Sequence, residues 1–291
     1  MIFVATGADA SANNLGKISL KSVSDIAPST TTMLNFFAKT WTDDQKIAID
    51  DFLVAFNAAT WKTKVKVISM PILIPVQNGV LGTEITPSGS KFRKNIVDFN
   101  NEITAIPGLI SSTFARIGVN QNGIVLQNDP GTGTITANAA LVLDVTTYGI
   151  TNKSLHYGVY YKHSDKFRSG SASSTQPLLE STLIRDSAQT FNNISVTANT
   201  TSSPKEQLLI LNGDVTVATS KSYVKNALVA TTIVNTNTSA VQVQASIITG
   251  GTDNIHNVST SCFMTFGNYM TDAELLEYGN LINTLMDVLV V

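Results

Sequence analysis

The last stretch of the chain, "MTFGNYMTDAELLEYGNLINTLMDVLVV" (residues 264–291), decides the fold class because a strand pattern changes there into a helix pattern. Thr271 and Glu274 have the spacing of a capping box, which marks the start of a helix. Apolar residues then recur at helical spacing and form one stripe: Leu275, Tyr278, Ile282, Leu285 and Leu289. The sequence therefore predicts an amphipathic helix over about 271–289, which must bury its stripe against another element.

A second segment, "WTDDQKIAIDDFLVAFNAATW" (residues 41–61), has the same organisation. Thr42 and Gln45 form another capping box, and the two aspartates between them lie where the helix dipole favours anions. Its apolar stripe consists of Ile49, Phe52, Leu53 and Phe56. We predict a helix over about 42–59.

Between these helices the apolar period is two residues, which is typical of strands with one buried face. In "QLLILNGDVTVAT" (residues 207–219), Asn212-Gly213 predicts a type I′ hairpin turn between two strands. About a dozen short strands of this kind, without an alternating βαβ pattern, indicate an antiparallel β-sandwich.

The predicted architecture is mainly β, with one antiparallel β-sandwich domain over residues 41–291 flanked by an N-terminal and a C-terminal amphipathic helix. Residues 1–40 are rich in small and polar types, so we expect an extended N-terminal arm or anchor with little core of its own. Lysines alternate at the start of the domain and predict one face of an early edge strand: Lys62, Lys64 and Lys66.

Composition narrows the function classes. With 19 Lys and Arg against 21 Asp and Glu, the net charge is -2, so the basic footprint of a nucleic-acid binder is missing. Cys262 is the only cysteine, which excludes an intrachain disulfide and favours a small buried hydrophobic role. The N-terminal stretch has no secretory pattern and no run is long enough to span a membrane, so we expect no membrane insertion.

At its two ends the chain resembles a family of bacteriophage virion proteins that carry a concanavalin A-like (laminin G-like) jelly-roll domain. The resemblance is carried by "TDDQKIAIDDFLVAFNAATWKTKVKVI" (residues 42–68), where a capped helix runs into the first strand, and by "FMTFGNYMTDAELLEYGNLINTLM" (residues 263–286). The stretch "LNGDVTVAT" (residues 211–219) is similar to a hairpin of that family. The resemblance implies a concanavalin-like jelly roll and a non-catalytic structural or adhesive part of a phage particle, in some members with sugar-binding capacity.

A sandwich can also carry glycoside hydrolysis, which in retaining enzymes needs two carboxyl groups about 5 Å apart. The sequence contains no E-x-D-x-x-E or E-x-D-x-E arrangement. Glu180 and Asp186 would be separated by roughly 20 Å along one strand. We therefore expect no enzyme, with an endoglycanase as the weaker alternative.

The histidines do not predict a shared metal site. His156 and His163 are seven residues apart, so one strand would point them to opposite faces, and His256 is distant in sequence. Calcium would suit the oxygen-rich segments 127–133 and 250–254, although each is also explained as an Asx or Gly turn. We expect no cofactor, with calcium as the alternative that these loops leave open.

The segment "YGVYYKHSDKFRSGSASSTQ" (residues 157–176) is the most suggestive surface candidate, because sugars are held by aromatic faces and a few convergent polar groups. At least two of its tyrosines must face the core if the segment is a strand. The candidate glycan-binding residues are Tyr160, Lys162, His163, Asp165 and Arg168.

We therefore expect a non-catalytic structural component of a virion, such as a capsid decoration, head fibre or tail component, made in the cytoplasm of the host bacterium. Its expected partners are other virion proteins and copies of itself in a trimer or an array. The alternative is a receptor-binding or glycan-binding adhesion module of a phage fibre, whose partner would be a host cell-surface glycan.

Overall fold

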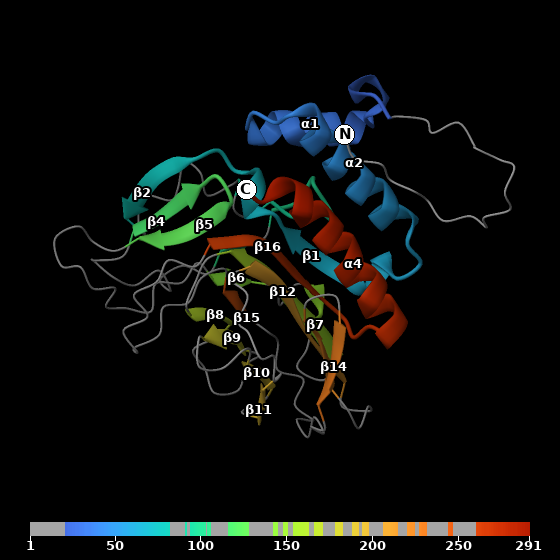
Figure 1. The fold of residues 1–291 in the computed structure, drawn as a ribbon, viewed down its shortest axis with the longest axis vertical. Coiled ribbons are helices and arrows are strands. Elements are labelled where there is room, and N and C mark those ends of the chain that lie inside the picture. Colours follow the sequence, from blue (N-terminus) through green and yellow to red (C-terminus); the bar gives the residue numbers. More distant parts are fainter. Residues whose placement is uncertain are drawn as a thin grey trace, which may run out of the picture.

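The fold is that of a computed structural model, in which antiparallel strands are flanked by three α-helices in the described part of the chain (Figure 1). The structure describes residues 21–81, 91, 94–102, 104–105, 116–127, 142–144, 148–150, 154–162, 166–170, 178–182, 188–191, 194–197, 206–214, 220–224, 227–231, 244–246 and 260–291. The predictions for residues 1–20 and for most of the two calcium-type loops lie outside these ranges.

Nine strands form the largest sheet, in the order β14-β13-β12-β7-β16-β5-β4-β2, with β1 pairing with β16 beside this path. All of these pairs are antiparallel. The strands are β1 Val65–Ser69, β2 Gln77–Leu81, β4 Arg116–Asn120, β5 Gly123–Gln127, β7 Ser154–Lys162, β12 Glu206–Asp214, β13 Ser220–Val224, β14 Ala227–Thr231 and β16 Thr260–Gly267.

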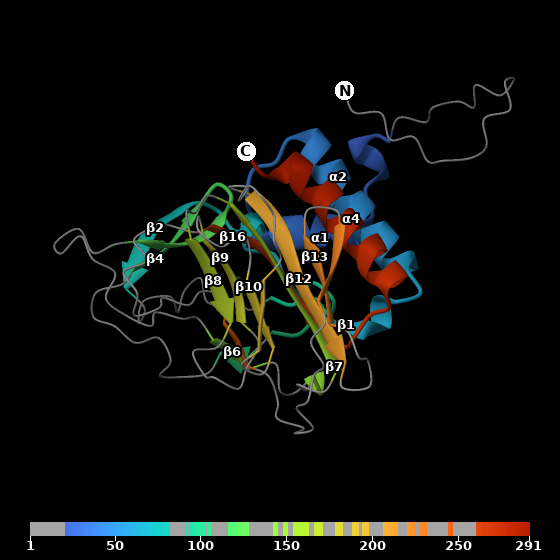
Figure 2. The same ribbon diagram turned by 60° about the horizontal axis from the view of Figure 1, so that its bottom comes forward.

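Two smaller antiparallel sheets lie on the side of the large sheet away from the helices (Figure 2). One has the order β11-β10-β9-β8 and the other β15-β6-β3. Their strands are β3 Thr104–Ala105, β6 Val142–Asp144, β8 Lys166–Gly170, β9 Leu178–Thr182, β10 Ala188–Phe191, β11 Ile194–Thr197 and β15 Gln244–Ser246. The predicted antiparallel β-architecture with flanking helices is confirmed, while the jelly-roll assignment stays a prediction.

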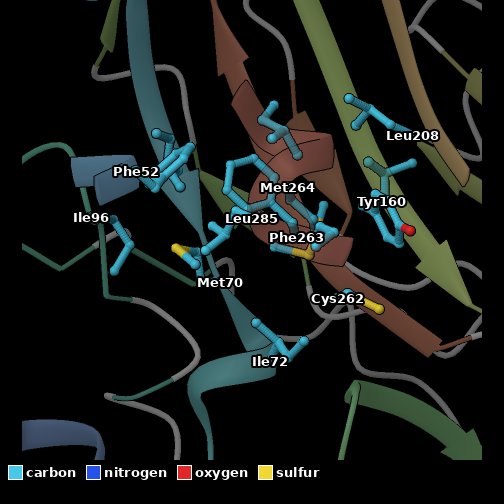
Figure 3. Packing of buried hydrophobic residues seen from close by; sticks show 14 of the residues in the cluster. Phe52, Met70, Ile72, Ile96, Tyr160, Leu208, Cys262, Phe263, Met264 and Leu285 are labelled. Carbon is cyan, nitrogen blue, oxygen red and sulfur yellow. The ribbon is translucent and has the colours of Figure 1, made fainter. Parts of the chain in front are cut away.

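The centre of the large sheet is covered on both faces. Successive side chains of a strand point to opposite faces, yet all of β16 and all of β7 after Ser154 are buried. The helices cover one of these faces (Figure 1). There Phe52 meets Phe263 of β16 edge to face, with ring centroids 5.9 Å apart, close to Leu285 (Figure 3).

The two predicted amphipathic helices are observed as α2 (Asp43–Ala58) and α4 (Asp272–Leu289). Both capping boxes are formed, because Thr42 and Thr271 each accept the backbone N–H of the glutamine or glutamate three residues on. All five residues of the predicted α4 stripe are buried. In α2 the same holds for three of the four, while Leu53 is half-buried.

Residues 21–40 differ from the extended arm that the sequence predicted. They form the short 3-10 helix η1 (Val23–Asp25) and the helix α1 (Pro28–Phe37). Pro28 suits the first helical position, and Met33 and Phe37, spaced four residues apart, are buried in the core cluster. Because most residues of this segment are polar, the sequence did not predict that Met33 and Phe37 belong to the core.

The lysine-bearing strand was predicted too early in the chain. Lys62–Lys64 form the 3-10 helix η2, and β1 begins only at Val65. The three ammonium groups have different partners: Lys62 donates to a carbonyl of α2, Lys66 to the carbonyl of Thr63, and Lys64 to Glu274. A further 3-10 helix, η3 (Pro71–Leu73), follows β1.

The predicted turn at Asn212-Gly213 is wrong. Both residues lie inside β12, which continues to Asp214, and Asn212 is paired with Lys221 of β13. Asn212 is fully buried, and its side-chain amide exchanges two hydrogen bonds with the backbone of Met270, at 2.8 and 2.9 Å. This asparagine therefore fastens a distant segment and does not supply a positive φ angle.

Candidate functional site

The two ends of the folded domain meet in one place, which we call the closing joint and define as β1, β16, α2 and α4. Strand β1 pairs with β16 in the register Val65↔Gly267, and the helices that precede β1 and follow β16 pack on each other. Three aromatic rings fill the space between them: Trp61 lies 4.9 Å and Phe56 6.3 Å from Tyr278, centroid to centroid.

An ion pair connects the last residue of η2, directly before β1, with the cap of α4. Lys64 Nζ lies 2.6 Å from Glu274 Oε2, and the same oxygen accepts hydrogen bonds from the backbone and hydroxyl of Thr271. Partial burial would raise the pKa of Glu274, but these hydrogen bonds outweigh it and lower that pKa. One carboxylate thus completes the cap and fixes the helix to the strand.

Gly267 allows the backbones of β1 and β16 to approach at this point. A Cβ atom there would lie 2.1 Å from the carbonyl oxygen of Lys64 and 2.4 Å from Cε1 of His156. No side chain larger than hydrogen fits without moving backbone.

His156 of β7 forms a buried polar chain beneath the joint. Its Nδ1 lies 2.7 Å from the carbonyl oxygen of Asn268, which can only accept, so Nδ1 carries the proton. Its Nε2 then accepts from the Thr265 hydroxyl at 3.4 Å, and that hydroxyl accepts from Tyr278 at 2.8 Å. The chain joins two strands to α4, with each polar group paired.

Burial lowers the pKa of His156 from 6.5 to about 4, although the hydrogen bond to Asn268 favours the charged form. Lys64 adds a smaller effect in the same direction as burial. Burial also raises the pKa of the Tyr278 hydroxyl. Both groups are therefore neutral at pH 7. The hydrogen bonds of His156, Thr265 and Tyr278 thus stabilise the packing of α4 on the sheet.

In the middle of α4, Tyr223 of β13 fixes the helix to the sheet. Its hydroxyl donates to Asn280 at 2.9 Å and accepts from Asn283 at 2.8 Å. Gly279 gives the ring its space, because a Cβ there would lie 2.4 Å from the ring of Tyr223. Helix α4 is thus held to the sheet along its length.

The structure describes only part of the predicted glycan site. Tyr160 is 4% exposed and belongs to the core, and Lys162 is 8% exposed and donates to the carbonyl of Val291. Neither offers a surface to a sugar, because strand β7 is covered on both faces. His163, Asp165 and the side chain of Arg168 lie outside the described residues, so the glycan site stays a prediction that rests on them.

Among the described residues there is no cluster of three or more His, Cys, Asp or Glu side chains that would hold a metal ion. Cys262 is buried, as predicted, and forms no disulfide; its thiol contacts the carbonyl of Thr260 at 3.7 Å. In the same part of the chain, no helix has both the length and the apolar character needed to cross a membrane.

No family model matches the chain, and no curated protein matches it. Among solved structures, Trypanosoma rangeli sialidase in complex with sialic acid aligns with a TM-score of 0.39 and 11% identity, over 60% of this chain and 30% of the sialidase. The CBM40 of Ruminococcus gnavus IT-sialidase gives 0.35 and 13%, over 50% and 94%. Leech intramolecular trans-sialidase gives 0.33 and 11%, over 50% and 26%. Because every one of these TM-scores is below 0.5, the likeness carries no argument about this chain.

Sequence reasoning did not find the structural roles of three polar residues that organise the described structure: Asp50, His156 and Asn212. Each is buried within a helix or strand whose neighbours in sequence are mostly apolar. A polar residue inside such a run needs a hydrogen-bond partner. The sequence shows each polar residue within its apolar run, but it does not show which distant residue is the hydrogen-bond partner.

Proposed function

We propose that this chain is a non-catalytic structural component of a bacteriophage virion, with a concanavalin-like jelly-roll body. The observation that supports the proposal is the closing joint. The two segments that carry the resemblance to phage virion proteins, residues 42–68 and 263–286, are about 200 residues apart in sequence and form one contiguous unit. The firm parts of the resemblance are these two ends, and it gains weight when they build one substructure.

The mechanism would be physical. A large sheet buried on both faces and closed by a fastened helix makes a rigid body that resists local opening. The chain has only 14% charged residues, so its surface contacts would be made mainly by amides and hydroxyls, which suits packing against copies of itself or other virion proteins.

The test is the composition of purified particles. Phage particles from infected host cells, banded by density and washed in high salt, should contain the chain at a fixed number of copies per particle by quantitative mass spectrometry. An abundant host cytoplasmic protein serves as the contamination control and should fall with each purification step. A chain that falls in parallel with that control would contradict the proposal.

A binding experiment distinguishes the structural virion component from the alternative, a glycan-binding adhesion module. Purified chain is titrated against a panel of bacterial surface polysaccharides with and without a calcium chelator. Saturable binding that is lost in Arg168→Ala and kept in Lys62→Ala would favour adhesion through the predicted segment. A blank panel together with fixed copies in the particle would leave the architectural function.

A further inference from the structure

Residues 21–37, which we call the strap, are attached to the rest of the domain by few polar contacts. The backbone hydrogen bonds of the strap stay within it or reach side chains of the body. In the described part of the chain, hydrogen bonds from the body to the strap come from only three residues: Asp50, Asp51 and Lys91. No strand pairing would have to break for the strap to leave.

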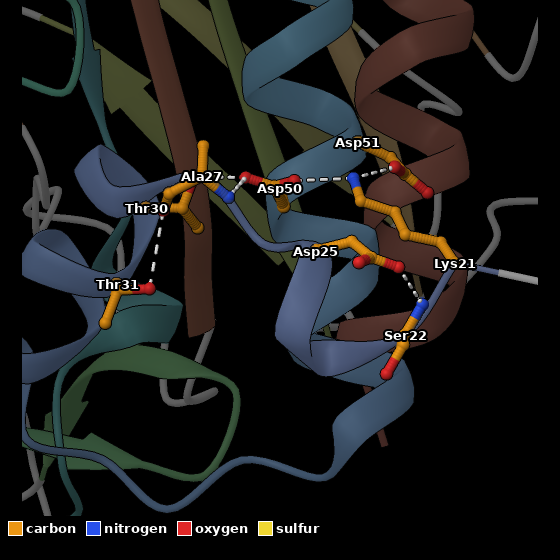
Figure 4. A network of polar contacts seen from close by, with 8 residues as sticks. All are labelled: Lys21, Ser22, Asp25, Ala27, Thr30, Thr31, Asp50 and Asp51. Atoms are coloured by element: carbon orange, nitrogen blue, oxygen red, sulfur yellow. Dashed lines mark hydrogen bonds and ion pairs between the residues drawn. The ribbon is translucent and has the colours of Figure 1, made fainter.

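Asp50 is the main fastening. The residue is 1% exposed. Its carboxylate accepts hydrogen bonds from Lys21 Nζ at 2.5 Å, from the backbone N–H of Ala27 at 3.1 Å and from the Thr30 hydroxyl at 2.5 Å (Figure 4). Burial would raise the pKa of Asp50, but these donors outweigh it and lower that pKa. A single carboxylate of α2 thus holds both ends of the η1–α1 connection.

The end of the strap carries backbone strain. Ala38, at the C-cap of α1, has a φ of 55° and is the one non-glycine residue with a positive φ in the described chain. Glycine is the usual residue at such a position, because a side chain clashes with the backbone there. The strain lies in the five-residue connection from α1 to α2, where a hinge would be.

The strap has little tendency to stay helical by itself. Helix α1 has ten residues, "PSTTTMLNFF", of which four are Ser or Thr, and all of these favour a helix less than alanine does. Its order depends on the apolar contacts of Met33 and Phe37 and on the rings of Phe36 and Phe99, whose centroids are 5.4 Å apart. Leaving the body would therefore unfold α1.

We infer that the strap is a releasable element, with Asp50 as its latch and Ala38 as its hinge, and that the body of residues 43–291 stays folded when the strap opens. This inference does not depend on the proposed virion function. In an assembled protein, the release of such a segment would free residues 21–37 to reach a neighbouring chain while the body keeps its shape.

The test is limited chymotrypsin digestion of the full chain at low protease concentration, following cleavage after Phe36 and Phe37 by mass spectrometry. Phe37 is buried, so the cut requires the strap to open, and the cleavage rate tracks the open population when closing is fast. Thermal unfolding followed by circular dichroism reports the body separately.

Asp50→Asn should accelerate these cuts about tenfold, because a buried charged hydrogen-bond hub is worth more than a kilocalorie. The matched control is Asp51→Asn, the same chemical change at a 48% exposed side chain whose one side-chain hydrogen bond among the described residues is to Lys21. It should change the rate by less than about threefold. Ala38→Gly should slow the cuts about threefold by removing the strain. The melting temperature of the body should stay within a few degrees in all three.

Two results would overturn the inference. Equal rates in the two aspartate variants would show that Asp50 is no latch. A fall in the melting temperature of Asp50→Asn in step with its cleavage rate would show that the strap unfolds together with the body.

Discussion

Helices α4 and α1 both cover the same domain, yet they are held by different means. Helix α4 is fixed by a buried apolar stripe, by the Lys64–Glu274 ion pair, by the Asn212–Met270 hydrogen bonds that precede it and by Tyr223 along its length. Helix α1 is fixed by two buried apolar side chains, Met33 and Phe37, by the ring of Phe36, by one buried carboxylate and by one lysine. The difference indicates that α4 closes the fold, whereas α1 is an accessory to it.

The reason for the difference lies in the chain. Helix α4 follows β16 directly, and β16 is the strand that pairs with β1, β5 and β7. Moving α4 would disturb the centre of the sheet. Helix α1 precedes α2 by a five-residue connection and touches no strand pairing in the described residues.

The largest loss of stability is expected from a charge placed at a buried position of α4 or α1. Leu285→Asp would bury an unpaired carboxylate, at a cost of several kcal/mol, and should unfold the domain, because total stabilities are only about 5–15 kcal/mol. Met33→Asp should displace the strap and leave the melting transition of the body in place. Urea unfolding followed by fluorescence measures the unfolding transition of the body in both variants.

Leu276→Asp is the control for this comparison, since Leu276 is exposed on the same helix as Leu285. It should change the free energy of unfolding by about 0.5 kcal/mol or less. Equal losses in Leu285→Asp and Leu276→Asp would mean that α4 is not packed as described.

Acid should weaken the joint through His156. Its folded-state pKa of about 4 lies below the unfolded value of 6.5, so the unfolded chain binds the proton more readily. The stabilisation is full above about pH 6.5 and is lost as the pH falls towards 4, by about 3 kcal/mol in all. Asp50 and Glu274 also have pKa values below their ordinary 3.8 and 4.5, so their contributions begin to fall near those values and are lost mainly at lower pH than that of His156.

Urea unfolding at half-unit pH steps from 7.5 to 4.5 tests this prediction. His156→Asn keeps a polar side chain but has no titration, so its stability should vary much less over that range. Wild-type and variant curves that run parallel would contradict the assigned burial of His156.

Gly279→Ala tests the contact between α4 and the sheet. Alanine normally favours a helix, but here its Cβ would lie 2.4 Å from the Tyr223 ring, so we expect a loss of about 1–3 kcal/mol. In a Tyr223→Leu background the loss should shrink, which a double-mutant cycle measures. A gain in stability in the wild-type background would show that the ring can move away freely.

The smallest effect is expected at the Lys64–Glu274 pair. Both side chains are partly exposed, so Lys64→Met should cost about 1 kcal/mol or less, and high salt should reduce the difference. Lys62→Met, at an exposed lysine without a carboxylate partner in the described structure, is the control. If the stability of both variants responds identically to salt, the Lys64–Glu274 pair does not contribute to stability.

The sequence predicted what local chemistry determines. Both amphipathic helices and their capping boxes followed from residues within a few positions of each other, at Thr42 and Thr271. Asn212-Gly213 has the same local appearance as a hairpin turn, but the distant backbone of Met270 decides its role. No reading of nearby residues could have found that partner.

The candidate site shows the same limit. Tyr160 and Lys162 were selected for their chemistry, yet strand β7 is buried on both faces because β12 and β16 flank it and layers cover it. The sequence could require that some tyrosines face the core, but it could not show that both faces were core. The strap was missed for a related reason, since Met33 and Phe37 are two apolar residues in a polar segment.

Native-state hydrogen exchange resolved by mass spectrometry tests the central contrast most directly. Amides of α4 and β16 should exchange only through global unfolding, whereas amides of α1 should exchange through a local opening at least about tenfold more frequent, with a weaker dependence on urea. Equal protection and equal urea dependence in α1 and α4 would show that the domain opens as one unit and would contradict the account.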